Sequence, residues 1–352
     1  MGLDANAAAP SSAFKLLFPE IVDHLLADLR QHYDLPSEAI HYIRHNLTYN
    51  VPHGKLNRGL AVHECYLAFC AREHKPTAAQ LRQAHVLGWC VELLQAFFLV
   101  ADDIMDDSHT RRGRPCFFRL PNIAMNAIND AMILEMMIYR LLRSHFAHHA
   151  AYPHLVELFH SITYTTELGQ LLDLTTSQPA DHVLLHKFSE DALRRIYRYK
   201  TSHYTFYLPV ALGMRLAGVC EAHKYDTAKD MCMHIGYYFQ AQDDFLDAFG
   251  DPQVTGKIGT DIEDNTCTWL IVRALERCSA DDRKLLERHY GKKHKESSDR
   301  VKQLYRKLQL PSLFAQFEQS SYERLSARIG AIDDMPTAAF ELLLSKLYKR
   351  NR

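Results

Sequence analysis

Apolar residues recur at helical spacing along most of the chain, beginning near Phe14. The clearest run covers residues 81–107, where apolar side chains follow each other three and four positions apart. Comparable runs occupy residues 124–148, 155–172, 193–218 and 225–249. Two later segments, residues 269–290 and 298–329, are more polar, which predicts helices that lie at the surface.

Short connections separate these predicted helices. They lie at residues 150–153, 175–181, 250–259 and 291–295. None has the length or the composition of a flexible linker, and no segment shows a convincing strand pattern. The sequence therefore predicts one all-α domain over residues 14–352, preceded by a flexible tail over residues 1–13.

Composition agrees with a helical, globular protein. The 14 glycines and 13 prolines make up about 8% of the 352 residues, below the roughly 12% of an average protein. This shortage argues against a barrel or sandwich built from many short strands. The formal net charge of −1 gives no overall attraction to nucleic acid or anionic lipid, so a charged ligand must be bound by a local cluster.

The cysteines and the first residues bear on the compartment. The eight cysteines contain no CxxC pair and no histidine at zinc-finger spacing, which favours reduced thiols in a reducing compartment. The opening MGLDANAAAPSS lacks the basic and apolar regions of a signal peptide. The longest stretch without Asp, Glu, Lys or Arg, residues 201–214, is too short to span a membrane. We therefore expect a soluble cytoplasmic protein that binds neither membrane nor nucleic acid.

The most informative feature is a DDxxD pentad that occurs twice, each time after aromatic and apolar residues. Its carboxylates are Asp102, Asp103 and Asp106 in the first copy and Asp243, Asp244 and Asp247 in the second. The first and last Asp of each pentad are four positions apart, so they share one face of a helix and repel each other. A cation relieves this repulsion, and ligands that are all carboxylates select Mg²⁺ when phosphate oxygens complete its shell.

Basic residues near these pentads supply the opposite charge. Arg111 and Arg112 follow the first pentad, and Lys55 and Arg58 lie in HGKLNRG just before a predicted helix. Lys200 and Lys257 stand in otherwise uncharged or Gly-rich surroundings. Each alone is typical of a solvated surface charge. Together with two Mg²⁺-type clusters, they indicate a site for two polyanions such as diphosphates.

Longer motifs surround these residues from Gly54 to Arg350. They are GKLNRG, ELLQAFFLVADDIMD, TRRGRPCF, TELGQLLDL, YKTSHYTFYLP, FQAQDDFLDAFGDP, TGKIGTDIEDN and the terminal LYKR. In these strings the chain resembles the trans-isoprenyl diphosphate synthase family, in particular the eukaryotic farnesyl diphosphate synthases. The resemblance covers nearly the whole chain.

The resemblance implies a fold, an assembly and a metal content. The fold is a mostly antiparallel helical bundle around a central cavity, the isoprenoid synthase fold, and the assembly is a homodimer. The two pentads are expected to face each other and to hold three Mg²⁺ ions, with Mn²⁺ as an alternative. The direct ligands carried over are Asp102, Asp106 and Asp243; the other pentad carboxylates would act through water or orient basic residues.

The resemblance also implies substrates and their binding residues. Isopentenyl diphosphate would be condensed with dimethylallyl and then geranyl diphosphate, by ionisation, condensation and elimination, to give farnesyl diphosphate. The allylic diphosphate would be held by Arg111, Lys200 and Lys257. The isopentenyl diphosphate would be held by Lys55, Arg58, Gln95 and Arg112. Lys200, Thr201 and Gln240 would serve catalysis by steadying the allylic cation, and no side-chain general base is required.

Phe97 and Phe98 precede Asp102 by about one helical turn. Bulky rings at this depth would stop a growing apolar chain, and in the family this aromatic pair accompanies a C15 product. The alternative that both are plain core residues is compatible with the same role.

Two positions depart from the family pattern and keep alternatives open. Thr266 stands where the family has a Lys, and Asp107 adds a negative charge beyond the first pentad. The alternatives are a terpene synthase or geranyl diphosphate synthase on the same fold, a non-catalytic subunit of a heteromeric prenyl synthase, and an unrelated helical scaffold. The complete isopentenyl diphosphate pocket weighs against the terpene synthase, and the two complete pentads weigh against the subunit and the scaffold.

Overall fold

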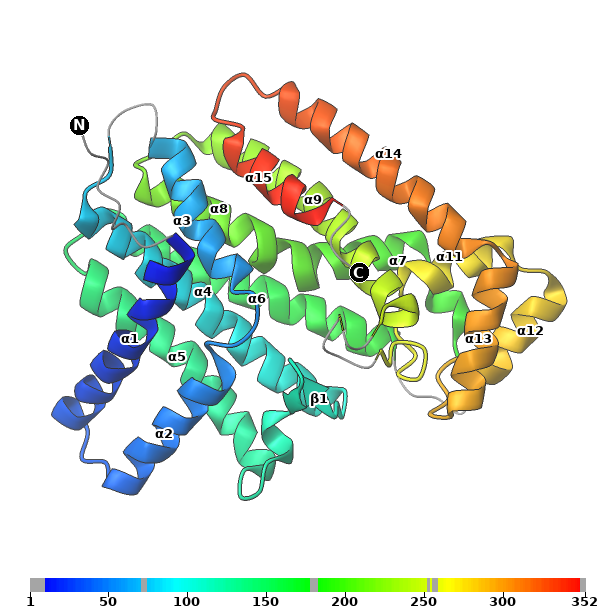
Figure 1. The fold of residues 1–352 in the computed structure, drawn as a ribbon, viewed down its shortest axis with the longest axis horizontal. Coiled ribbons are helices and arrows are strands. Elements are labelled where there is room, and N and C mark those ends of the chain that lie inside the picture. The colour runs from blue at the N-terminus through cyan, green and yellow to red at the C-terminus, as the bar shows by residue number, and fades with distance from the viewer. Residues whose placement is uncertain (1–9, 71–74, 178–182, 252–253, 255–258, 349–352) are drawn as a thin grey trace. The chain divides into compact units, whose positions relative to one another are not determined.

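The structure is a computed structural model, and it describes residues 10–70, 75–177, 183–251, 254 and 259–348. Within this part of the chain the secondary structure is helical apart from one two-stranded hairpin (Figure 1). The all-α prediction is confirmed. Most of the predicted tail lies outside the described residues, and the first helix already begins at Pro10.

Internal contacts divide the chain into two compact units. The first comprises residues 1–159 and 209–220, and the second comprises residues 160–208 and 221–352. The single-domain prediction stays a prediction, and each unit is described by itself.

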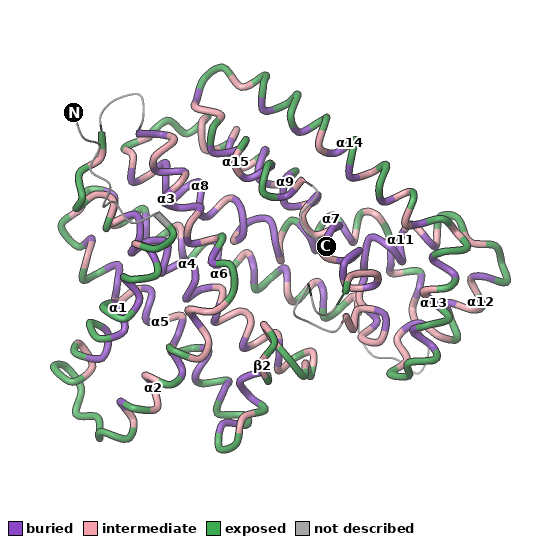
Figure 2. The backbone as a smooth tube through the Cα atoms, in the orientation of Figure 1, coloured by how far each residue is buried: buried purple, intermediate pink, exposed green. Residues whose placement is uncertain are grey.

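The first unit is built around a long central helix, α4. Its elements are α1 (Pro10–His32), α2 (Ser37–Asn50), α3 (Asn57–Cys70), α4 (Ala78–Met105), β1 (Thr110–Arg111), β2 (Arg114–Pro115), η1 (Phe117–Arg119), η2 (Ala124–Asn126), α5 (Ala127–Phe146), the start of α6 (Tyr152–Thr176) and α8 (Leu208–Leu216). Helix α4 packs against α3 and α5, and α1 packs against α4. Helix α4 is buried without interruption from Ala84 to Leu94, in the middle of the helix (Figure 2).

Helix α4 begins at a capping box, in which Thr77 and Gln80 bond to each other's backbone N–H groups. Its apolar residues cover nearly the whole circumference, which is typical of a core helix. Trp89 stacks on Phe14 with ring centroids 4.5 Å apart and donates its indole N–H to the Phe14 carbonyl. Among the described helices, α4 is long and apolar enough to cross a membrane, but 72% of its apolar window is buried inside the protein.

The second unit is built around α9. Its elements are the rest of α6, η3 (Leu185–Lys187), α7 (Glu190–Ile196), the π-helix η4 (Tyr197–Tyr207), α9 (Ala222–Phe249), α11 (Trp269–Arg277), α12 (Ala280–His289), α13 (Lys295–Lys307), α14 (Leu310–Gly330) and α15 (Ala338–Leu347). Helix α9 packs against η4, α11, α14 and α15. Phe245 of α9 stacks on Phe314 of α14 at 4.2 Å between centroids, which joins these helices in one core.

Three of the predicted helical runs differ from the structure. Residues 193–218 form α7, η4 and α8 rather than one regular helix. Residues 298–329 are divided at Gln309, whose φ of 57° ends α13 before α14 begins. The surface prediction for residues 269–290 is wrong for α11, because its apolar positions share one face and are buried: Trp269, Leu270, Ile271, Val272 and Ala274.

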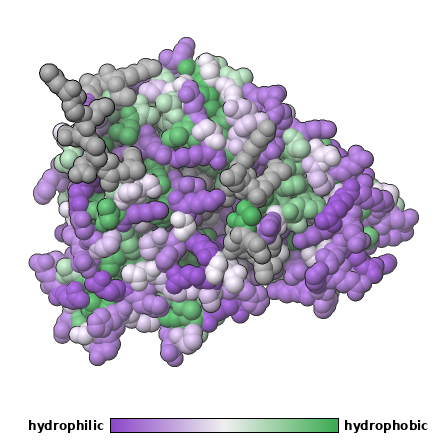
Figure 3. All heavy atoms as spheres, viewed as in Figure 1, coloured by the Kyte–Doolittle hydropathy of each residue, from purple (hydrophilic) through white to green (hydrophobic). Residues whose placement is uncertain are grey.

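The face of the molecule drawn in Figure 3 is mainly hydrophilic.

Candidate active site

The first pentad lies at the C-terminal end of α4. Asp102 and Asp106 are half-buried, whereas Asp103 is 4% exposed. Each residue of an α-helix turns the side chain by about 100°, so the second Asp of the pentad points into the protein. The carboxylates at positions one and five are thus more accessible than the carboxylate at position two.

Arg111 neutralises the buried carboxylate. Its Nε and Nη2 both donate to Oδ1 of Asp103, at 2.9 and 2.5 Å, and Nη2 lies 3.6 Å from Oδ2 of Asp102. Burial raises the pKa of Asp103, and Arg111 opposes this rise. Burial alone would lower the pKa of Arg111, but the Asp103 charge raises it above its ordinary value. Arg111 thus stays charged beside the first pentad.

The hairpin after the pentad fixes the direction of Arg112. Strands β1 and β2 are joined by Arg112 and Gly113, whose φ angles are 54° and 73°. Positive φ at both central residues is the pattern of a two-residue hairpin turn that follows the strand twist. Arg112 donates to the Asn50 carbonyl at 3.3 Å, and a Cβ at Gly54 would lie 2.9 Å from its Nε.

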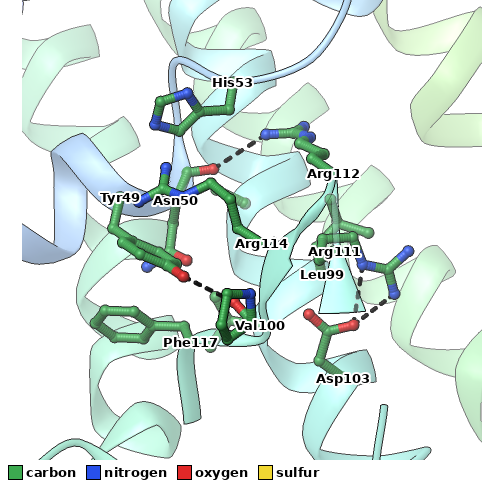
Figure 4. A pocket seen from close by; sticks show the side chains of 12 residues that line it. Tyr49, Asn50, His53, Leu99, Val100, Asp103, Arg111, Arg112, Arg114 and Phe117 are labelled. Carbon is green, nitrogen blue, oxygen red and sulfur yellow. Dashed lines mark hydrogen bonds and ion pairs between the residues drawn. The ribbon is translucent and has the colours of Figure 1, made fainter. Parts of the chain in front are cut away.

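A pocket lies beside this hairpin (Figure 4). Its walls come from α2, α4, the hairpin and η1, and they comprise Tyr49, Asn50, His53, Ala96, Leu99, Val100, Asp103, Arg111, Arg112, Arg114, Pro115 and Phe117. The Arg114 guanidinium lies 3.7 Å from the centre of the Tyr49 ring, and the Tyr49 hydroxyl donates to the Pro115 carbonyl at 2.8 Å. These two contacts hold the hairpin against α2. Burial and the neighbouring Arg114 lower the pKa of His53.

Buried Glu92 organises the predicted isopentenyl diphosphate residues. It accepts the Gly59 N–H at 2.7 Å, and burial raises its pKa while Arg58 and Arg112 oppose this. With its amide in the orientation that satisfies both ends, Gln95 donates to Glu92 at 3.0 Å and accepts from Arg58 at 3.0 Å. Lys55 is exposed on the loop before α3.

Phe97 and Phe98 lie on α4 just before the pentad. Both rings are partly exposed, and their centroids are 4.8 Å apart at an interplanar angle of 42°. Phe98 precedes Asp102 by four residues, so it lies on the same helical face as that carboxylate. Its role in chain length stays a prediction.

The second pentad lies near the end of α9 and repeats the burial pattern of the first. Asp243 and Asp247 are half-buried, whereas Asp244 is 4% exposed. Asp244 accepts from the Tyr197 hydroxyl, from the Trp269 N–H at 2.7 Å and from the Gln240 amide at 3.1 Å. Burial raises its pKa to about 7, although these hydrogen bonds lower it.

Lys200 and Thr201 lie on the π-helix η4, a conformation that occurs mostly as single turns and often at functional sites. Lys200 donates to Oδ2 of Asp173 on α6 at 2.6 Å. Gly169, one turn earlier on α6, permits this approach, because a Cβ there would lie 2.1 Å from the Lys200 backbone nitrogen. Thr201 donates its hydroxyl to Oε1 of Gln240 at 2.8 Å.

The pentads suit a hard cation. Each offers two half-buried carboxylates on one helical face, with no Cys or His among them. Within the described residues no three His, Cys, Asp or Glu side chains converge on one point. Mg²⁺ usually keeps several waters and binds through one or two carboxylates plus substrate phosphates, so this donor set fits Mg²⁺ better than a metal that needs a complete protein cage.

The two departures from the family pattern have local structural accounts. Asp107 is exposed and accepts from Arg119, which balances its charge. The backbone of Thr266 donates to the Asp261 carbonyl at 2.9 Å and its carbonyl accepts from Tyr290 at 2.6 Å.

The structure brings most of the predicted site residues into two groups. In the first unit Arg58 contacts Gln95, Arg112 lies against Gly54 next to Lys55, and Arg111 lies against the first pentad. In the second unit Gln240 contacts the second pentad and Thr201 contacts Gln240, whereas Lys200 is bonded to Asp173. Lys257 lies outside the described residues, and the facing of the two pentads stays a prediction.

Sequence reasoning missed several side chains that hold these residues in place. They are His53, Glu92, Arg114, Asp173 and Tyr197. Asp173 carried a signal, since it lies in TELGQLLDL four residues after Gly169. Glu92 and Arg114 also lie in motifs, ELLQAFFLVADDIMD and TRRGRPCF, whereas His53 and Tyr197 lie in none.

Comparisons with known proteins agree on a single family. The model of the polyprenyl synthetase family matches residues 40–308. The chain is 45% identical over 347 residues to farnesyl pyrophosphate synthase of Saccharomyces cerevisiae, covering 96% of the chain and 97% of the relative. It is 45% identical over 336 residues to the enzyme of the same name from Homo sapiens, covering 95% of the chain and 80% of that relative. Among solved structures it is similar to T. brucei farnesyl diphosphate synthase complexed with risedronate, with a TM-score of 0.90, 31% identity and coverage of 98% and 100%.

Proposed function

The chain belongs to the polyprenyl synthetase family, and we propose that it is a prenyltransferase that condenses isopentenyl diphosphate with dimethylallyl and then geranyl diphosphate to give farnesyl diphosphate. The near full-length identity to farnesyl pyrophosphate synthases supports this activity, and the all-α fold is that of the isoprenoid synthases.

The repeated burial pattern of the pentads carries the proposal. In both, the carboxylates at positions one and five remain half-buried, while the carboxylate at position two is buried and bonded by protein donors. A pair of acidic helix ends with only structural roles would not need this division. The proposed direct ligands of the cation are Asp102, Asp106 and Asp243. Asp247, which accepts the Asp261 N–H at 3.1 Å, would act through water.

Three Mg²⁺ ions, with Mn²⁺ as a substitute, would neutralise the allylic diphosphate and stabilise the charge that develops on it as it leaves. Arg111 places a fixed positive charge beside the first pentad, and Lys200 is fixed on η4 in the unit that carries the second pentad. Each is held by a carboxylate of its own unit, Asp103 and Asp173 respectively. Because these contacts already hold both side chains, neither has to become ordered when the diphosphate binds.

Ionisation leaves an allylic cation that must be kept from water. Thr201 and Gln240 offer oxygen dipoles that steady the cation and are poor nucleophiles. Lys55, Arg58 and Arg112 bind isopentenyl diphosphate, whose double bond attacks the cation. The new carbon–carbon bond forms, a proton leaves the adjacent carbon, and the released diphosphate accepts it. No side-chain base is required.

The test is a product assay of the purified chain with Mg²⁺. One reaction contains dimethylallyl and isopentenyl diphosphates, and a second contains geranyl diphosphate alone. Farnesyl diphosphate in the first reaction supports the proposal, whereas a C10 end product identifies a geranyl diphosphate synthase. A hydrocarbon or alcohol as the main product of the second reaction identifies a terpene synthase, and no product in either reaction supports the non-catalytic subunit.

Two aspartates five positions apart give a matched pair of variants. Asp102→Asn removes a proposed ligand, and we expect a loss of kcat of about 100-fold or more. Asp107→Asn changes a nearby exposed carboxylate that pairs with Arg119, and we expect kcat within about threefold of the original. Equal losses in the two variants would contradict the assignment of the first pentad as a metal site.

The homodimer is part of the same proposal. Helix α5 exposes large apolar side chains four positions apart at Ile128, Met132 and Met136, and α6 exposes Tyr164, Leu168 and Leu171. Apolar stripes of this kind are typical of surfaces that another protein covers. Light scattering should give twice the 40.6 kDa chain mass, and a monomeric mass would refute the dimer. We also propose a cytoplasmic location, which imaging of a tagged chain tests.

A further inference from the structure

Tyr197 is a buried side chain to which the reaction above gives no role. It is the first residue of η4 and is 2% exposed. Its hydroxyl donates to Oδ2 of Asp244 and accepts the Trp269 N–H at 3.1 Å. A buried phenol whose hydroxyl both donates and accepts a hydrogen bond does more than fill space in the core.

The contact between η4 and α9 fixes the position of this hydroxyl. A Cβ at Gly236 of α9 would lie 2.1 Å from Oγ of Ser202, so the two helices approach as closely as their backbones allow. Ser202 in turn donates to the Tyr197 carbonyl at 2.9 Å. Tyr197 therefore cannot move away from α9 without moving the π-helix that carries Thr201.

Asp244 links these hydrogen bonds to the Gln240 side chain and determines which way its amide points. The end of the Gln240 side chain that faces Asp244 is its NH₂ group, which donates a hydrogen bond to the carboxyl oxygen. The distance from Nε2 of Gln240 to Oδ1 of Asp244 is 3.1 Å. The reversed amide would place its oxygen against a carboxylate oxygen, which is repulsive. The amide oxygen of Gln240 thus points to Thr201.

The orientation of the Gln240 amide in turn determines the orientation of the Thr201 hydroxyl. Its hydrogen is donated to Oε1 of Gln240 at 2.8 Å. Both lone pairs of the Thr201 oxygen are left for other partners, and an electron-deficient carbon is stabilised by lone pairs rather than by an O–H hydrogen.

We propose that Tyr197 is a positioning residue for the cation-stabilising pair Thr201 and Gln240, acting through Asp244. Together with the Trp269 N–H it holds the carboxylate in the rotamer that orients the Gln240 amide, and the amide orients the Thr201 hydroxyl. The inference rests on the proposed function, because it assigns Thr201 and Gln240 to the allylic cation.

Tyr197→Phe removes the hydroxyl and keeps the ring. We expect kcat with geranyl and isopentenyl diphosphates to fall about tenfold, the rate equivalent of one hydrogen bond to a charged group, with both KM values within about twofold. Tyr42→Phe is the matched control, because the Tyr42 hydroxyl donates to buried Asp130 at 2.7 Å in the first unit. It should lower the melting temperature and leave kcat unchanged.

A second readout separates positioning from stability. In the reaction with geranyl diphosphate, the allylic C–O bond breaks and its electron pair leaves with the diphosphate. Water that captures the cation and loses a proton gives an allylic alcohol. With less well-placed dipoles, Tyr197→Phe should release several times more alcohol per farnesyl diphosphate than the original chain, whereas Tyr42→Phe should not.

A double-mutant cycle identifies the route of the effect. Thr201→Val removes the last hydroxyl of the network, so adding Tyr197→Phe to it should lower kcat by less than about twofold. A full further tenfold loss in the double variant, or an unchanged kcat in Tyr197→Phe alone, would overturn the inference. If Tyr197→Phe does not fold, Asp244→Asn keeps the size of the side chain but removes the acceptor that fixes the Gln240 amide, and an unchanged kcat there overturns the inference equally. If the original chain makes no farnesyl diphosphate, the proposed function fails instead.

Discussion

Replacing Gly169 by alanine tests whether the close approach of α6 to η4 sets the geometry of the site. A Cβ at this position would lie 2.1 Å from the Lys200 nitrogen and 2.4 Å from the Tyr199 carbonyl carbon, both backbone atoms. Ordinary contact begins at 3.4 Å. The π-helix must therefore retreat by about 1.3 Å, because backbone cannot turn aside as a flexible side chain does.

The expected effect is larger on rate than on stability. Overpacking costs about 1–3 kcal/mol, and the better helix propensity of alanine returns about 1 kcal/mol of this. A displacement of roughly 1 Å at a reacting centre lowers the rate about 100-fold. Lys200 and Thr201 both lie on the displaced segment, so kcat with geranyl diphosphate should fall by about that factor.

Gly330→Ala is the matched control, since Gly330 is also helical and a Cβ there meets nothing within 4 Å. It should stabilise the protein slightly and leave kcat unchanged. Steady-state kinetics and thermal unfolding are measured on both variants. If Gly169→Ala keeps kcat within about twofold and melts like Gly330→Ala, the approach of α6 has no part in the geometry of the site.

Three further predictions concern other parts of the chain. Phe98→Ala should give products longer than C15, read by chromatography of the dephosphorylated products, and an unchanged C15 product would remove Phe98 from chain-length control. Arg112→Gln should raise KM for isopentenyl diphosphate about tenfold or more and change KM for geranyl diphosphate little, because only the former is assigned to Arg112; equal increases would contradict this assignment. Burial lowers the pKa of His85 to about 4, and the neighbouring His63 lowers it further. Between pH 6.5 and 4, His85 is therefore protonated in the unfolded chain and neutral in the folded chain. Stability should fall as pH decreases from 6.5 to 4, by up to about 3 kcal/mol from this group, and a melting curve of His85→Leu with the same pH dependence would exclude His85 as the cause.

Much of the fold was predictable because it depends on local periodicity. The run at residues 81–107 corresponds to α4 (Ala78–Met105), since its spacing, its Thr77 cap and its near-continuous apolar surface all favour one long buried helix. The error at Trp269 has the opposite cause. The charged residues of α11 and α12 dominate the average over residues 269–290, and they conceal the apolar face that buries α11.

The π-helix was not predictable from periodicity. Residues 193–218 keep an apolar pattern that suits an α-helix, and the extra residue per turn in η4 is stabilised by tertiary partners. Gly169 and Gly236 allow backbone approach from two sides, and Ser202 bonds back to the Tyr197 carbonyl. These partners lie on other helices, so no window of sequence contains the cause.

The pentads show how a motif can be found in the sequence while half of its meaning depends on structure. Helical spacing alone places positions one and five on one face, which is why Asp102 and Asp106 could be assigned as a pair. The same geometry turns position two inward, where a carboxylate needs buried donors. The donor is Arg111 for the first pentad, eight residues away in sequence, and it adds positive charge beside the proposed metal ligands. For the second pentad the donors are neutral, with Tyr197 47 residues away. The two copies therefore present their carboxylates at positions one and five in the same way and differ at position two. Asp103 accepts hydrogen bonds from Arg111, which we propose binds phosphate, and Asp244 accepts a hydrogen bond from Gln240, which we propose faces the allylic carbon.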